Sequence, residues 1–197
     1  MKRFMLLSAV VLFSLRSFGE VSLGLNFSSE FTNNASQQNQ NNRTNSVYYD
    51  LTIEPTLLIL ISEMIEVAPF AGFTFGSQAN YTNDDQINKN SNSGFNFGCG
   101  LNFRIIGNEL IRFSIGPRVA YEMSFVHDSD EYTLTPSFGA PANIDLQFND
   151  RFFMRLSPLL AEIKYQHHSY GQDRYNGEFK FNIITQTGSS IGFFITF

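Results

Sequence analysis

The chain has 197 residues, of which 43% are hydrophobic and 16% charged, so it carries fewer charges than the roughly 25% of an average soluble domain. Its formal net charge of -5 lacks the basic surface that a nucleic-acid backbone requires, and we expect no nucleic-acid partner. The single cysteine, Cys99, excludes an internal disulfide and a cysteine-based metal site. We expect a single folded domain with no metal and no cofactor.

The first nineteen residues are typical of a cleaved secretory signal peptide. Lys2 and Arg3 give a positive start, residues 4–15 are mainly apolar, and Ser17 and Gly19 place small residues before the cleavage point. The apolar stretch is shorter than the roughly 20 residues that a membrane-spanning helix needs. We therefore predict a signal peptide at 1–19 and a mature domain at 20–197.

Apolar and polar residues alternate with period two through most of the mature chain, which indicates β-strands with two different faces. The eight predicted strands cover residues 21–28, 47–59, 65–76, 95–105, 111–125, 132–148, 152–165 and 179–197. In the seventh of these, the alternation slips near Leu160. A β-bulge would produce such a slip, because it adds one residue to one strand of a pair.

The connections between these strands alternate in length. Short turns are predicted near residues 62–64, 107–108 and 149–150, and longer polar loops at 33–46, 83–93, 127–130 and 167–177. Tight turns at one end and long loops at the other are typical of transmembrane β-barrels, whose turns face the periplasm and whose loops face the exterior. Both ends of the mature domain would then lie on the periplasmic side.

The two faces of the strands decide between a membrane barrel and a soluble one. A soluble eight-stranded barrel or sandwich would turn the Phe- and Tyr-rich face inward, but an eight-stranded barrel has little room inside. The opposite face, rich in Gly, Ser, Thr and Asn, suits a narrow lumen better. The sequence therefore predicts an all-β fold, an eight-stranded antiparallel up-and-down transmembrane β-barrel in the outer membrane of a Gram-negative-type bacterium.

The end of the chain carries a family resemblance. Apolar residues stand at alternate positions up to the last residue, at Ile191, Phe193, Ile195 and Phe197. With the eight-strand pattern, this ending resembles the small outer-membrane β-barrels, the family that includes OmpX and the barrel domain of outer membrane protein A. The resemblance implies an assembly signal for the outer-membrane assembly machinery. It also implies a monomer in contact with outer-membrane lipid and lipopolysaccharide.

Charged residues of both signs fall on the predicted inward face. Unpaired charges would be costly in a narrow lumen, so we expect an ion network that plugs it; the alternative is a gated ion or proton path. The predicted network consists of Glu54, Glu66, Arg104, Arg112, Arg118, Glu122, Asp145 and Arg155.

The predicted loops are the other place where function could lie. Nine of the fourteen residues in 33–46 are Asn or Gln, which offer many hydrogen-bonding groups and almost no charge. Such a loop suits either a surface ligand, for example a glycan, or a solvated segment without a partner. We expect a structural, envelope-integrity or adhesion-like role.

One cluster indicates an alternative enzymatic role. His167, Ser169 and Glu178 would lie close to the outer leaflet, where a base, a nucleophile and an orienting acid are the groups that acyl transfer needs. A His-x-Ser pair with a Glu is similar to that of the lipid A deacylase barrels. In that family an Asn follows the Ser, whereas this chain has Tyr170, and Glu178 has the inward parity. We expect a polar loop edge here and keep these three as the only catalytic candidates.

Overall fold

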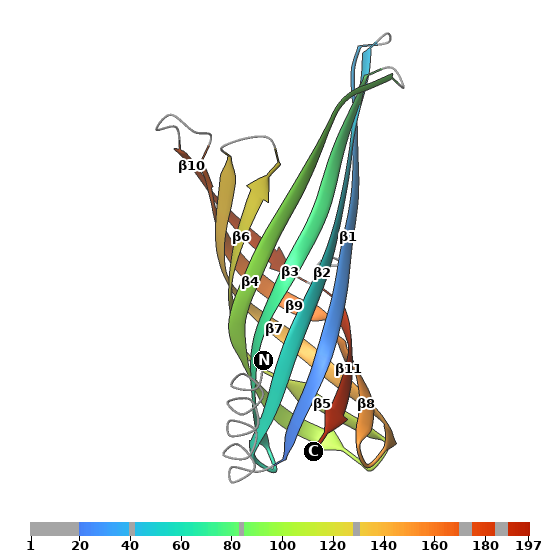
Figure 1. Cartoon of the computed structure of the whole chain (residues 1–197), viewed down its shortest axis with the longest axis vertical. Coiled ribbons are helices and arrows are strands. Elements are labelled where there is room, and N and C mark those ends of the chain that lie inside the picture. The colour runs from blue at the N-terminus through green and yellow to red at the C-terminus, as the bar shows by residue number, and fades with distance from the viewer. Residues whose placement is uncertain (1–19, 40–41, 83–84, 128–130, 170–174, 184–188) are drawn as a thin grey trace, which may run out of the picture.

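The structure is a computed structural model that describes residues 20–39, 42–82, 85–127, 131–169, 175–183 and 189–197 (Figure 1). The predicted signal peptide at 1–19 lies outside these residues. The described part contains the strands β1 (Val21–Asn39), β2 (Asn42–Ser62), β3 (Ile65–Thr82), β4 (Asp85–Gly107), β5 (Ile111–Ile115), β6 (Arg118–Val126), β7 (Tyr132–Asn149), β8 (Phe152–Ser157), β9 (Leu159–Ser169), β10 (Tyr175–Ile183) and β11 (Ser190–Thr196).

These strands form a closed antiparallel ring of eight barrel strands. β5 and β6 are the two parts of the fifth barrel strand, β8 and β9 of the seventh, and β10 and β11 of the eighth. The ring closes where β1 pairs with β2 on one side and with β11 on the other, with Leu25 opposite Phe193. The predicted eight-stranded antiparallel barrel is confirmed.

Prolines interrupt the ladder where two barrel strands divide. Pro117 lies between β5 and β6, and Pro158 lies between β8 and β9. Because proline has no backbone N–H to donate, the ladder of hydrogen bonds is interrupted at these two positions. The predicted bulge near Leu160 is confirmed. Pro141 of β7 pairs with Leu159 and Ala140 pairs with Ala161, so that Leu160 is the extra residue.

Asparagine side chains shape two of the short turns. The Asn108 side-chain oxygen accepts hydrogen bonds from the backbone N–H groups of Leu110 (2.9 Å) and Ile111 (2.8 Å). The Asn149 oxygen accepts from the N–H groups of Arg151 and Phe152 at 2.9 Å each. These contacts mimic a backbone turn, which is why Asn is favoured there. We call this end of the barrel the turn end.

The first two long connections differ from the prediction. Residues expected to form loops at 33–46 and 83–93 lie mostly in paired strands, because β1 continues to Asn39, β2 starts at Asn42 and β4 starts at Asp85. We call the resulting extension of β1–β4 the ribbon: residues 32–39, 42–48, 76–82 and 85–92. It projects well beyond the other strands (Figure 1). Backbone pairing continues past the apolar face here, and alternation alone does not reveal it.

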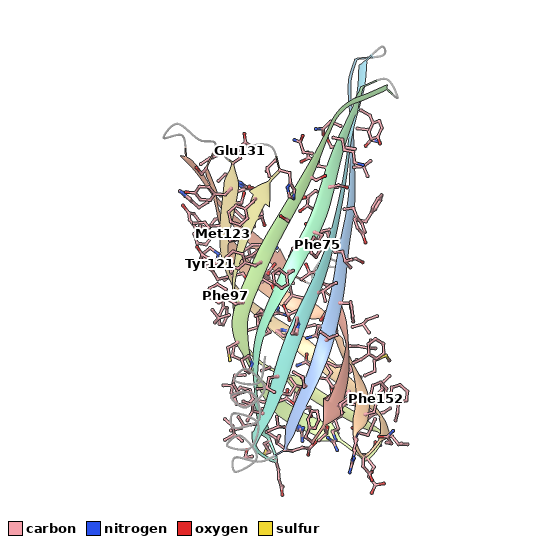
Figure 2. All side chains as sticks on the ribbon, viewed as in Figure 1. Phe75, Phe97, Tyr121, Met123, Glu131 and Phe152 are labelled. Carbon is pink, nitrogen blue, oxygen red and sulfur yellow. The ribbon has the colours of Figure 1, made fainter. Side chains whose placement is uncertain are left out.

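Large apolar side chains cover the outside of the barrel. Among the described residues, the buried apolar side chains are only Val21, Leu58, Ala68, Phe70, Phe153, Leu159 and Phe194, and many more large ones are exposed. Phe97, Tyr121 and Phe152 lie on this outer surface (Figure 2). Soluble monomers rarely expose apolar patches above a few hundred Å², so this belt indicates a lipid-facing surface. No helix in the described part of the chain is long and apolar enough to cross a membrane.

Candidate functional site: the barrel lumen

A buried ion cluster lies in the lumen towards the turn end. Arg155 of β8 is only 4% exposed and lies between two carboxylates, Glu66 of β3 and Asp145 of β7. Its guanidinium nitrogens donate to Asp145 at 2.6 and 2.8 Å and to Glu66 at 2.7 and 3.1 Å. Such bidentate, charge-assisted contacts are the strongest class of protein hydrogen bond. The cluster therefore ties together three strands across the lumen.

Neighbouring polar groups complete this cluster. The Asn102 amide donates to Glu66 at 2.8 Å, and its oxygen accepts from the amide of Asn143 at 3.0 Å. Arg104 lies 3.8 Å from Glu66, at the limit of an ion pair. Every carboxylate oxygen of the cluster therefore has at least one donor, and Glu66 Oε1 has two, as charges need when they leave water.

A second ion pair lies further from the turn end. Arg118 of β6 donates to Glu54 of β2 at 2.6 Å, and Asn96 donates to the same carboxylate oxygen at 3.3 Å. The Arg118 guanidinium also lies 4.0 Å from the ring centre of Phe70. This geometry is that of a cation–π contact, which adds about 0.5–2 kcal/mol.

An apolar layer fills the lumen beside the ion cluster. Phe194 is fully buried and stacks on Phe153, with ring centres 5.1 Å apart and planes 10° from parallel. Inward-facing glycines leave room for these rings, because a Cβ at Gly24 would meet Phe194 and one at Gly98 would lie 2.5 Å from Phe70. We call this layer, with the Arg155 cluster, the floor: Leu58, Glu66, Ala68, Phe70, Asp145, Phe153, Arg155 and Phe194.

The predicted ion network is only partly assembled. The structure brings together Glu66, Arg104, Asp145 and Arg155 in one cluster and Glu54 with Arg118 in another. Arg112 and Glu122 share the inward face but make no ion pair within 4 Å to any described residue; Glu122 accepts a hydrogen bond from Ser124 at 3.0 Å.

The apolar side chains of the floor were not among the residues predicted to face the lumen. Leu58 and Phe70 share the inward parity of Glu54 and Glu66 on their strands, and Phe153 shares that of Arg155. Their position in the alternation therefore indicates that these side chains face the lumen, and the inward glycines indicate the space that they fill. The prediction that large apolar residues all face lipid overlooked both indications.

The three catalytic candidates are not assembled into one site. His167 and Ser169 follow the outward parity of Ile163 and Tyr165 along β9, but Ser169 is buried. Glu178 lies on the inward parity of β10 and pairs with Lys180 at 3.3 Å. The neighbouring His168 contacts the Thr133 hydroxyl at 2.9 Å instead. Glu178 therefore lies on the opposite face of the sheet from His167 and Ser169.

The residues of the predicted assembly signal face outward. Ile191, Phe193, Ile195 and Phe197 are all exposed on β11 and the final residue. β11 is held between β1 and β8, so the end of the chain completes the ring.

The chain is similar to solved structures of other proteins, but matches no family model and no curated protein sequence. Among solved structures, the outer membrane protein OprG from Pseudomonas aeruginosa is similar with a TM-score of 0.57 and 10% identity, over 91% of this chain and 96% of OprG. Neisserial surface protein A aligns with a TM-score of 0.43 and 9% identity, over 90% of this chain and 96% of that one. Ail, the attachment invasion locus protein of Yersinia pestis, aligns at 0.36 and 13% identity, over 91% and 99%.

The barrel ring and its apolar outer belt together place the chain in the outer membrane. Barrels span membranes because closing the ring satisfies every backbone group without an edge. The chain thus has the fold of an eight-stranded outer-membrane β-barrel, with a polar and partly apolar lumen.

Proposed function

We propose that the protein is a surface-interaction protein: a closed barrel that anchors the ribbon in the outer membrane and presents it to an uncharged ligand such as a glycan. In this proposal the turn end faces the periplasm and the ribbon faces the exterior. The observation that carries it is the combination of a floor that fills the lumen with a paired, projecting ribbon. Packed side chains block the lumen at the floor, so the exposed surface is where the function would lie.

The composition of the ribbon supports this role. Its backbone is paired: on β1 and β2 Asn34 stands opposite Ser46, and on β2 and β3 Ser46 stands opposite Asn80. The Ser46 hydroxyl donates to Asn80 at 2.8 Å. Amide and hydroxyl groups on a fixed backbone are the neutral donors and acceptors that glycan hydroxyls pair with. The narrower resemblance to OmpX and the outer membrane protein A barrel stays a prediction.

The test removes the ribbon at paired positions. One variant joins Phe31 to Tyr49 and Phe75 to Ser93, each through an Asn-Gly turn, since both pairs are directly opposite in the sheet. The matched control shortens the β6–β7 hairpin in the same way, joining Phe125 to Tyr132. Both variants should keep the heat-dependent gel shift of a folded barrel.

The readout is adherence of cells displaying each variant to glycan-coated surfaces. The proposal expects adherence to fall to the level of cells without the protein when the ribbon is removed, and to persist in the control. Unchanged adherence without the ribbon would overturn it. If detergent sensitivity rose instead in cells lacking the protein, the envelope-integrity role would replace it.

A further inference from the structure

Above the floor, the lumen contains a cavity of about 210 Å³. Its lining extends from Arg155 to the level of Glu30 and Asp50, and the cavity is partly open. Pockets for drug-sized ligands usually measure about 300–1,000 Å³, so this space suits a small or slender molecule.

The cavity has more negative than positive groups left over after pairing. Each lining cation already has a carboxylate partner: Arg118 has Glu54, Arg155 has Glu66 and Asp145, and Lys164 has Glu162 at 2.9 Å.

Two lining carboxylates, Asp50 and Glu122, have no cation within 4 Å among the described residues. Asp50 accepts hydrogen bonds from the Tyr48 hydroxyl and from the Asn92 amide (3.4 Å), and Glu122 accepts from Ser124. Neutral donors only partly replace a counter-charge for a carboxylate inside a barrel.

Two neutral acceptors in the wall of the cavity, covered beside Gly192 and Gly72, also lack donors. The side-chain oxygens of Asn26, which is 8% exposed, and of Asn96 are buried without a hydrogen-bond partner. Their amide orientations are fixed: Asn26 donates to the Thr56 hydroxyl at 2.7 Å, and that hydroxyl donates to the Glu54 backbone oxygen. The Asn96 amide likewise donates to the Glu54 carboxylate. Exchanging oxygen and nitrogen would break these contacts.

These acceptors and carboxylates belong to two levels of the lumen. Asn26 pairs with Glu54, and Asn96 pairs with Glu122, so one level crosses β1, β2, β4 and β6. Asp50 contacts Asn92, which stands four residues before Asn96 on β4. Four residues of an extended strand span about 13 Å, so the two levels are about that far apart along the strand. The cavity is therefore short of positive charge over an elongated distance.

We propose that this cavity binds a linear polyamine. Each ammonium group brings a positive charge and several N–H donors, and a flexible chain separates the ammonium groups along the lumen. A divalent metal fits less well, because it needs six or more oxygen ligands and the described residues contain no group of three His, Cys, Asp or Glu suited to an ion. The floor lies beneath the cavity, so the polyamine is held there and not passed through the barrel.

The test uses the purified, folded full-length barrel in detergent micelles and isothermal titration with spermidine. Saturable binding is expected, weakened about tenfold or more by Asp50→Asn or Glu122→Gln, because each removes a charge-assisted contact. Glu109→Gln, an exposed change at the turn end, is the matched control and should bind as the unchanged protein does. The heat-dependent gel shift checks that every variant is folded.

A further variant keeps both carboxylates. Asn92→Lys places an ammonium group beside Asp50 and should weaken spermidine binding by supplying the missing charge from the chain itself. Absence of spermidine binding, or equal binding by Asp50→Asn, Glu122→Gln and Glu109→Gln, would overturn the proposal. So would titration with Mg²⁺ that gave saturable binding when spermidine did not.

Discussion

Replacing Arg155 by Met should strongly destabilise the barrel. The guanidinium makes four contacts of 2.6 to 3.1 Å to Glu66 and Asp145, and all three side chains are buried. Methionine fills a similar volume but leaves Asp145 without a cation and Glu66 with only Arg104, 3.8 Å away. Removing one partner of a buried ion pair costs about 3–5 kcal/mol, and because two buried carboxylates lose their nearest cation here we expect about 5 kcal/mol, near the upper end.

Two comparisons isolate the cause of this loss. Arg112→Met removes another inward arginine that has no ion pair among the described residues, and it should cost less than about 1 kcal/mol. Combining Arg155→Met with Glu66→Gln and Asp145→Asn removes the three buried charges of the cluster at once and keeps only the partly exposed Arg104. This triple change should recover most of the loss, because no charge is then left buried alone.

The free energy of unfolding can be followed in lipid vesicles by urea titration. The chain contains no tryptophan, so the fraction folded is best measured from the heat-dependent shift on a gel. If Arg155→Met were no more destabilising than Arg112→Met, or if the triple variant were as unstable as Arg155→Met, the floor would not be an interdependent ion cluster.

Three further predictions follow from the lumen and the belt. Gly24→Val should abolish the folded gel species because its side chain collides with Phe194, whereas Gly100→Ala, whose Cβ would find its nearest neighbour at 3.6 Å, should fold normally. Phe97→Arg, on the lipid-facing surface of β4, should cost about 2–4 kcal/mol of unfolding free energy if Phe97 is near the bilayer midplane. The control Ser77→Arg, on the outer face of β3 beyond the belt, should cost little. The unchanged protein should give no steady single-channel conductance in planar bilayers. Stable open-channel currents would contradict a lumen that is blocked at the floor.

The strands were predictable because their faces differ along the chain. Period-two alternation gave the eight barrel strands and even the bulge at Leu160, since an extra residue reverses parity in the sequence itself. The extent of β1 and β2 was not predictable in this way. In the ribbon both faces are polar, so nothing in the alternation marks where pairing stops.

Pairing inside the lumen was harder to predict for a different reason. Whether a carboxylate meets Arg155 or Arg112 depends on the register between strands that are distant in sequence, such as β3 and β8. Parity places a side chain inside but not at a given height and angle. Burial of Phe70 and Phe194 likewise depends on glycines of neighbouring strands, which only the ring brings beside them.

The central claim is that the apolar face of this barrel contacts lipid and its polar face lines the lumen. Cys99, the only cysteine, is exposed on the outer face of β4, so a nitroxide label can be attached to the unchanged chain in vesicles. The account predicts that dissolved oxygen relaxes this label far more than a polar relaxation agent does. A label at Thr52→Cys in a Cys99→Ser background, within the lumen cavity, should show much less of that preference. A Cys99 label relaxed mainly by the polar agent would contradict the account.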